Sequence, residues 1–265
     1  MFIPLRPSDG RPQRAIAALT LSGLLLAGCA GGGDTGLGVD LVSQEQVQEM
    51  GAETWQRIHS ETPASGNQEY QQTADRVAGN LLEAAGANPG EWEVVVFEGE
   101  QANAFALPGG QIGIYEGMFQ VAENEAQLAA VIAHEIGHVE AEHSQERVNS
   151  EVATQGAVQL ISAALQVGNV GYANAIAGAL GAGAQYGVLL PYSRNQELEA
   201  DRTGLRLMAE AGYDPREALE FWRRMEQQGG DRPPAFLSTH PAAGERIEQL
   251  QELMPEAEEA YEGNG

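Results

Sequence analysis

Two histidines and a glutamate lie within five consecutive residues of an apolar segment, at His134, Glu135 and His138. On a helix of about 3.6 residues per turn, the imidazoles of His134 and His138 project from one face and can bind a single ion. Glu135 lies beside that ion, where its carboxylate can take a proton from a metal-bound water as a general base. The spacing predicts a metal-dependent hydrolase, and the plainer alternative is a pair of buried histidines bonded to backbone groups.

A catalytic zinc site needs a third protein ligand and one open position. Residues 197–201 supply two carboxylates four residues apart, Glu197 and Asp201, on one face of a predicted helix. We expect Glu197 to bind the zinc and Asp201 to accept a hydrogen bond from the far nitrogen of one ligand histidine, which fixes its tautomer. Taken alone, such a cluster is also typical of the acidic first turn of a solvated helix.

Three other side chains are weaker candidates for the third ligand. Glu199 lies about 200° from Glu197 around the helix and has no carboxylate four residues later. His143 follows His138 by five residues and, on a continuous helix, points well away from the first two histidines. His59 lies in a polar surface segment. We therefore expect His143 and His59 to stand outside the site.

A further histidine, His240, is followed six residues later by Arg246. The His240 imidazole can stabilise the negative oxygen of a tetrahedral intermediate beside the zinc. It can instead occupy the open coordination position and hold the enzyme closed, or simply cap the helix that follows. Arg246 either orients the site or pairs with surface acids. The sequence leaves these alternatives open.

The elements that must position these residues follow from hydrophobic periodicity and from turn and cap residues. The pattern predicts an α+β fold that is mainly helical, with a small sheet and an active-site helix that carries the two histidines. The predicted helices are 43–59, 67–85, 125–147, 196–211, 215–228 and 242–253, the strands are 92–97, 104–107 and 111–115, and 229–239 is a loop. If strand 104–107 lies at the sheet edge, it can bind an extended substrate by strand addition; the alternative is a place in the middle of the sheet.

The N-terminal residues resemble an export signal. Basic residues precede a short apolar run at 15–26, and two small residues then lead to Cys29, the single cysteine. Residues 26–29, Leu-Ala-Gly-Cys, resemble a bacterial lipobox, so we expect residues 1–28 to be a signal peptide, Cys29 to carry lipid, and 29–40 to be a flexible tether. A catalytic domain at 41–253 and an acidic tail at 254–265 complete the predicted organisation. With one cysteine, an internal disulfide or a cysteine-based zinc cluster is excluded.

Charge and composition limit the partners. The chain has 265 residues, no lysine and a formal net charge of -24, so its surface repels polyphosphate and a nucleic-acid partner is not expected. Residues 152–193 are rich in glycine and alanine and carry no charge. We interpret this segment as a small-residue helical hairpin rather than a membrane span, because polar amides interrupt it, and we expect it to cover or gate the cleft.

Four motifs in one order resemble the zinc metallopeptidases related to HtpX, BepA and LoiP. They are residues 103–110, 134–138, 197–201 and 238–241 with Arg246. The resemblance covers about residues 40–253 and implies a gluzincin domain with one Zn²⁺ per chain, held by His134, His138 and Glu197, with Asp201 behind them. Membrane helices of the HtpX type and the helical-repeat domain of BepA are absent from the sequence, so a LoiP-like outer-membrane lipoprotein is the nearest type.

The sequence therefore predicts a zinc endopeptidase that cleaves extended or misfolded envelope proteins in protein quality control. We expect catalysis by Glu135, with Asp201 and His240 assisting, at the periplasmic face of a bacterial outer membrane to which Cys29 attaches the chain. The alternatives are a metal-bearing holdase or assembly factor that does not cleave, and a structural zinc protein. A general base at Glu135 argues against the first, and the lack of a fourth, cysteine ligand argues against the second.

Overall fold

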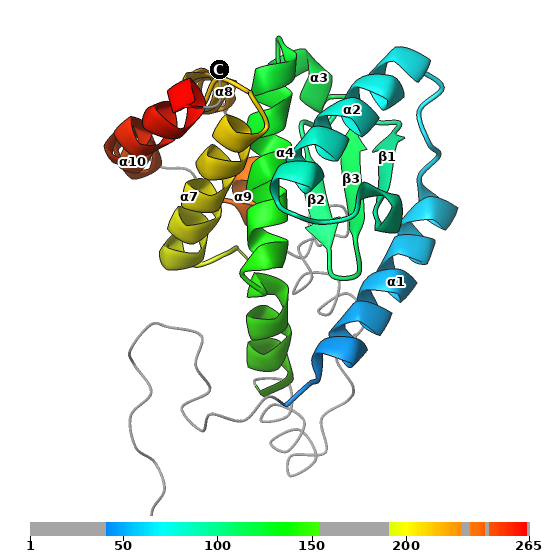
Figure 1. Cartoon of the computed structure of the whole chain (residues 1–265). Helices are drawn as coiled ribbons and strands as arrows, with labels where there is room; N and C mark the ends of the chain where they lie inside the picture. The colour runs from blue at the N-terminus through cyan, green and yellow to red at the C-terminus, as the bar shows by residue number, and fades with distance from the viewer. Residues whose placement is uncertain (1–40, 154–190, 229–233, 242–243, 264–265) are drawn as a thin grey trace, which may run out of the picture. The chain divides into compact units, whose positions relative to one another are not determined.

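The computed structural model describes residues 41–153, 191–228, 234–241 and 244–263. The predicted signal peptide, Cys29, the tether and most of the Gly/Ala-rich segment lie outside these residues. Helices and one three-stranded sheet make up the described part (Figure 1). This confirms the mainly helical α+β fold. None of the described helices is long and apolar enough to cross a membrane.

Four of the helices begin directly after a capping residue, and the helix predicted from residue 196 begins two residues earlier, at Arg194. Ser43 and Ser193 each form a capping box with the glutamine three residues later, and Asn67 and Asn124 accept hydrogen bonds from the first turns of their helices. The helices are α1 (Gln44–Glu61), α2 (Gln68–Ala84), α3 (Met118–Val121), α4 (Glu125–Glu140), α7 (Arg194–Glu210), α8 (Arg216–Gln227), α9 (Ala235–Thr239) and α10 (Gly244–Gly263), with a 3₁₀ turn at Pro89–Glu91. Residues 143–153 are also helical.

The strands are β1 (Glu93–Phe97), β2 (Ala104–Leu107) and β3 (Gln111–Tyr115), in the order β1-β3-β2. Strands β1 and β3 are parallel, and β2 is antiparallel to β3. Strand β2 therefore lies at one edge of the sheet, as the strand-addition hypothesis requires. At the opposite edge, the Gln71 amide bonds both Val94 and Val96 of β1, and the Ser65 N–H donates to the Val96 carbonyl.

Helix α4 is the centre of the fold. It lies between the sheet with α2 on one side and α7 on the other (Figure 1). Its residues from Gln127 to His138 are all buried. Helices α4 and α7 cross closely because glycines lie at the crossing. A Cβ on Gly137 would fall 2.8 Å from the Ala200 carbonyl oxygen, and one on Gly204 would fall 3.2 Å from the backbone nitrogen of His134. This close crossing brings Glu197 and Asp201 of α7 to the two histidines of α4.

The structure corrects the ends of two predicted helices and adds one short helix. The helix predicted over 125–147 ends at Glu140, because Glu142 has a left-handed backbone (φ 54°) and the helix at 143–153 begins after it. The predicted loop contains the short helix α9. The last helix continues to Gly263, although the acidic composition predicts a tail after Leu253. Met254 and Ala257 are buried three residues apart, so residues 254–263 continue an amphipathic helix.

Candidate metal centre and active site

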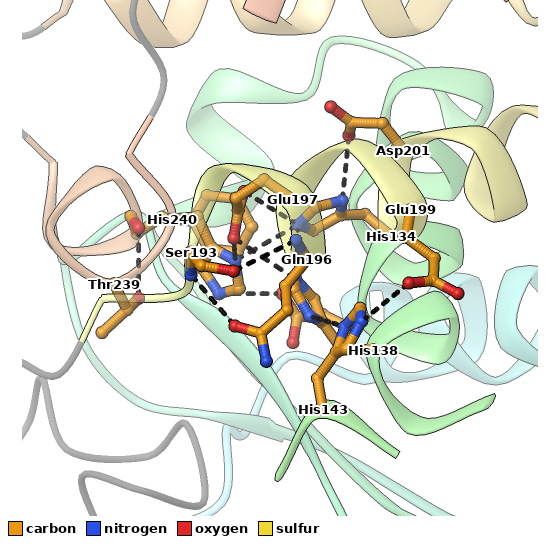
Figure 2. Close-up of polar contacts among 12 residues, drawn as sticks. His134, His138, His143, Ser193, Gln196, Glu197, Glu199, Asp201, Thr239 and His240 are labelled. Atoms are coloured by element: carbon orange, nitrogen blue, oxygen red, sulfur yellow. Dashed lines mark hydrogen bonds and ion pairs between the residues drawn. The ribbon is translucent and has the colours of Figure 1, made fainter. Parts of the chain in front are cut away.

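Four side chains converge on one buried point: His134 and His138 from α4, Glu197 from α7, and His240 directly after α9 (Figure 2). One ligand atom from each lies within 4.8 Å of all the others. The Nε2 atoms of His134 and His138 are 3.0 Å apart, and His240 Nδ1 lies 3.2 Å from His134 Nε2 and 3.1 Å from Glu197 Oε1. Every residue of this group is at most 4% exposed. The structure therefore brings the three predicted ligands together and adds His240 to them.

The far nitrogens of the two α4 histidines also have partners. Asp201 Oδ1 lies 3.0 Å from His134 Nδ1, as the sequence predicts. Because this carboxylate can only accept, its hydrogen bond with His134 requires the proton on Nδ1 and leaves the lone pair of Nε2 for the metal group. Arg246 Nη2, a donor, also lies 2.9 Å from Nδ1 and 3.2 Å from Nε2 of this ring. His138 Nδ1 faces His143 Nδ1 at 2.9 Å. Two imidazole Nε2 atoms and a carboxylate that point at one another are a donor set that fits a divalent metal ion.

Burial and charge set the protonation of this group. Burial lowers the pKa of His134 to about 4 and that of His138 well below its usual value, so both imidazoles are neutral at pH 7. Burial alone raises the pKa of Glu197, but Arg246 and His240 outweigh it and hold that pKa well below the usual range. The donors are thus two neutral imidazoles and one carboxylate, the forms in which these side chains bind metals.

Glu135 lies beside the group and not in it. Its Oε2 accepts a hydrogen bond from the Ala106 N–H of β2 at 3.1 Å, and its Oε1 lies 3.2 Å from His240 Nε2 without an aligned hydrogen bond. Burial raises the pKa of Glu135 to about 7, although the charge of His240 acts in the opposite direction. A carboxylate with a pKa near neutrality and one oxygen free is suited to accept and return a proton.

Arg246 is buried in the site and does not pair with surface acids. Its Nε and Nη2 bind both oxygens of Asp201, Nε at 2.7 Å, and its Nη1 donates to Glu197 Oε2 at 2.7 Å. The guanidinium carbon lies 3.5 Å from the centre of the Trp222 ring, a cation–π contact. Arg246 therefore fixes Asp201 and Glu197 and supplies their counter-charge. It orients the site, which is the first of the two predicted alternatives.

The sequence does not predict the contacts that two residues, His143 and Tyr192, make with the histidines. His143 is not one of the four residues that could bind the metal. The expectation that it stands outside the site is nevertheless wrong, because the turn at Glu142 brings its ring into contact with His138. Tyr192, the residue before the cap of α7, stacks on the His138 ring at 3.8 Å. Its position near the end of the uncharged segment 152–193 gives no signal of this role.

The remaining rejected candidates stay outside the group. His59 makes an edge-to-face contact with Trp55, and its Nε2 lies 3.7 Å from Oε1 of the exposed Glu93. The side chain of Glu199 is 64% exposed and contacts His143, not the four residues of the metal group. The edge position of β2 and the contact of Ala106 with Glu135 link the sheet to the site.

The fold and the buried group define a metallopeptidase, and comparison with known proteins agrees. Residues 64–254 match Peptidase family M48, and the chain belongs to this family. It is 34% identical over 223 residues to the mitochondrial metalloendopeptidase OMA1 of Schizosaccharomyces pombe, covering 82% of this chain and 64% of that protein. It is 36% identical over 168 residues to the Arabidopsis thaliana protein of that name, covering 63% and 33%.

A bacterial relative is similar over a shorter stretch. The β-barrel assembly-enhancing protease of Yersinia pestis is 32% identical over 158 residues, covering 56% of this chain and 31% of that protein. The chain thus spans from about a third to just under two thirds of the length of these relatives. The comparisons confirm the family to which the motifs pointed, while the finer resemblance to LoiP-like lipoproteins stays a prediction.

The predicted location in a bacterial cell envelope is wrong by this comparison. The relatives from Schizosaccharomyces pombe and Arabidopsis thaliana are named as mitochondrial enzymes. The expectation depended on the short N-terminal segment, which lies outside the described residues, and on the resemblance to LoiP-like lipoproteins. Lipid attachment at Cys29 stays a prediction.

Proposed function

We propose that the protein is a zinc endopeptidase that cleaves extended or misfolded polypeptide chains in protein quality control. The observation that carries the proposal is the convergence of His134 Nε2, His138 Nε2 and Glu197 on one buried point, with the free Glu135 oxygen beside it. In this proposal His134, His138 and Glu197 hold the metal ion, Glu135 is the general base and Asp201 orients His134.

A bound Zn²⁺ supplies a Lewis acid that polarises the peptide carbonyl and acidifies water. The residues of the chain supply the rest. Glu135 takes the proton of the attacking water and delivers it to the leaving amine, and its raised pKa of about 7 suits both directions of transfer. The Ala106 N–H holds the other oxygen of Glu135 and so fixes the carboxylate for this work.

The edge position of β2, which pairs on one side only among the described strands, favours binding of an extended substrate. The Tyr115 N–H donates to the Asn103 carbonyl at 3.0 Å, so by antiparallel alternation the N–H and carbonyl of Ala104 and the carbonyl of Ala106 face away from β3 and are left for a substrate, while the Ala106 N–H is already bound to Glu135. Among the described residues no strand pairs with this edge, and Ala106 already contacts Glu135. A peptide added here would be recognised through its backbone, which favours unfolded chains over any one side-chain sequence.

For His240 we propose the closing role. Its Nδ1 lies within 3.2 Å of both His134 Nε2 and Glu197 Oε1, where a fourth ligand would lie, and its ring stacks on Phe236 at 4.4 Å. A fourth protein ligand leaves no open position for substrate. Cleavage then requires that the α9 segment moves His240 away.

The test measures degradation of unfolded casein by the full chain together with its metal content. Glu135→Gln should retain zinc and lose cleavage by at least about 100-fold, because the general base is gone. Glu140→Gln, on the same helix but paired with Arg206, is the matched control and should cleave like the wild type. Chelation should abolish cleavage and added Zn²⁺ restore it. Equal slow degradation by wild type and Glu135→Gln would instead support the holdase alternative.

A further inference from the structure

His143 and Glu199 form a chain of contacts that leads from the centre to the surface (Figure 2). His143 is 2% exposed, although the side chain of Glu199 is 64% exposed. His143 Nδ1 lies 2.9 Å from His138 Nδ1, and His143 Nε2 lies 3.4 Å from Glu199 Oε2. Each ring nitrogen of His143 therefore faces one partner.

The direction of the hydrogen bonds along this chain follows from the metal site. If His138 binds a metal ion through Nε2, the proton of its neutral ring lies on Nδ1. That N–H can donate only to a bare nitrogen, so His143 Nδ1 accepts. The proton of His143 then lies on Nε2, and the Glu199 carboxylate accepts it. All three groups are satisfied in this one arrangement.

The two α4 histidines are thus held by different means. His134 is held directly by Asp201, a buried carboxylate that Arg246 binds in turn. The partner of His138 is a neutral ring, so no second buried carboxylate is needed at the centre. Tyr192 stacks on the His138 ring at 3.8 Å and fixes the plane of that ring. The hydrogen bond with His143 then sets how the His138 ring is turned within its plane and which ring nitrogen carries the proton.

We propose that His143 is a positioning residue that holds His138 as an Nε2 metal ligand, with Glu199 as its anchor at the surface. The inference rests on the proposed function to the extent that His138 binds the metal. Outer partners of ligand histidines contribute about 10- to 100-fold to metal affinity. The more distant and exposed Glu199 should contribute less than His143.

The experiment measures Zn²⁺ affinity of the full chain by competition with a chromophoric chelator, and the visible spectrum after Co²⁺ substitution, without any peptide substrate. His143→Phe fills the space but cannot accept a hydrogen bond, so affinity should fall about 10- to 100-fold and the Co²⁺ bands should shift. His143→Asn keeps an amide oxygen as acceptor and should recover most of the affinity and the spectrum. The Zn²⁺ affinity of Glu199→Ala should fall by a few-fold, and that of Glu199→Gln, whose amide oxygen still accepts a hydrogen bond, should fall by less.

His59→Phe, a histidine substitution outside the group, is the control and should bind Zn²⁺ like the wild type. Wild-type affinity in His143→Phe would overturn the inference, as would equal losses in His143→Phe and His143→Asn, which indicate a packing role only. If His143→Phe fails to fold, the comparison of His143→Asn with Glu199→Ala still decides. A loss of Zn²⁺ affinity in Glu199→Ala alone supports the inferred contacts from His138 through His143 to Glu199, and wild-type affinity in both variants overturns them. A wild-type chain that binds no metal would refute the proposed function, whereas tight binding by every His143 variant refutes this inference alone.

Discussion

Gly137 of α4 lies so close to Ala200 of α7 that a Cβ on the glycine would fall 2.8 Å from the alanine carbonyl oxygen. The same crossing places Glu197, three residues before Ala200, against His134 and His138. The metal group is therefore assembled by helix packing as well as by the spacing of its ligands. A glycine between the two histidines is a steric requirement of that packing.

Substitution of Gly137 tests this requirement. Gly137→Ala should push α4 and α7 apart, because the obstructing atom belongs to the backbone, and should lower the free energy of unfolding by about 1–3 kcal/mol. Zn²⁺ affinity should fall with it as Glu197 moves away. Gly79→Ala in α2 is the matched control, since a Cβ there meets nothing within 4 Å and should stabilise the helix by up to about 1 kcal/mol. Chemical denaturation and chelator competition measure both effects, and a Gly137→Ala chain as stable and as tightly binding as the wild type would contradict the packing account.

Local spacing predicted the parts of the site that depend on one helix each. His134, Glu135 and His138 follow from helical periodicity, and so do Glu197 and Asp201 on the next ligand helix. The place of His143 could not follow, because periodicity assumes a continuous helix and the left-handed backbone at Glu142 breaks it. Tyr192 depends on how the chain enters α7, a tertiary relationship that leaves no periodic pattern.

Substitution of His240 tests whether this residue closes the metal site. His240→Ala should keep the metal, because three protein ligands remain, and should increase casein cleavage several-fold by opening the fourth position. A loss of about 100- to 1,000-fold with metal retained would instead assign His240 to oxyanion stabilisation. Rates per bound metal ion separate these outcomes from a change in metal content. His59→Ala serves as the control for removal of a histidine and should leave the rate unchanged.

Arg246 should matter most when no metal is bound. Arg246→Leu leaves Asp201 and Glu197 buried without their counter-charge, a change that typically costs about 3–5 kcal/mol. Zn²⁺ supplies positive charge beside Glu197, so the loss of stability should be smaller in the metal-loaded chain. Arg246→Lys keeps the charge but loses the guanidinium fork that binds both Asp201 oxygens. Its stability should therefore lie between that of the wild type and that of Arg246→Leu. Melting temperatures with and without Zn²⁺ measure this difference, with exposed Arg223→Leu as the control; equal losses in both states would contradict it.

The pair of Arg76 on α2 and Glu125 on α4 predicts a pH-dependent contribution to stability. Arg76 Nη2 donates to Glu125 Oε1 at 2.6 Å, and this hydrogen bond holds the pKa of Glu125 below its usual value of 4.5. A carboxyl whose pKa is lowered in the folded state stabilises the fold above its unfolded pKa, and that contribution disappears as the pH falls through the folded pKa. Glu125→Gln should therefore melt slightly below the wild type at pH 7, and the difference should vanish well below pH 4.5. Because both side chains are about half exposed, salt screens the pair and the difference should be on the order of one degree. Thermal melts from pH 7 to pH 3 measure it, with exposed Glu248→Gln as the control, and a difference that persists or grows at low pH would show that Glu125 acts through packing and not through its charge.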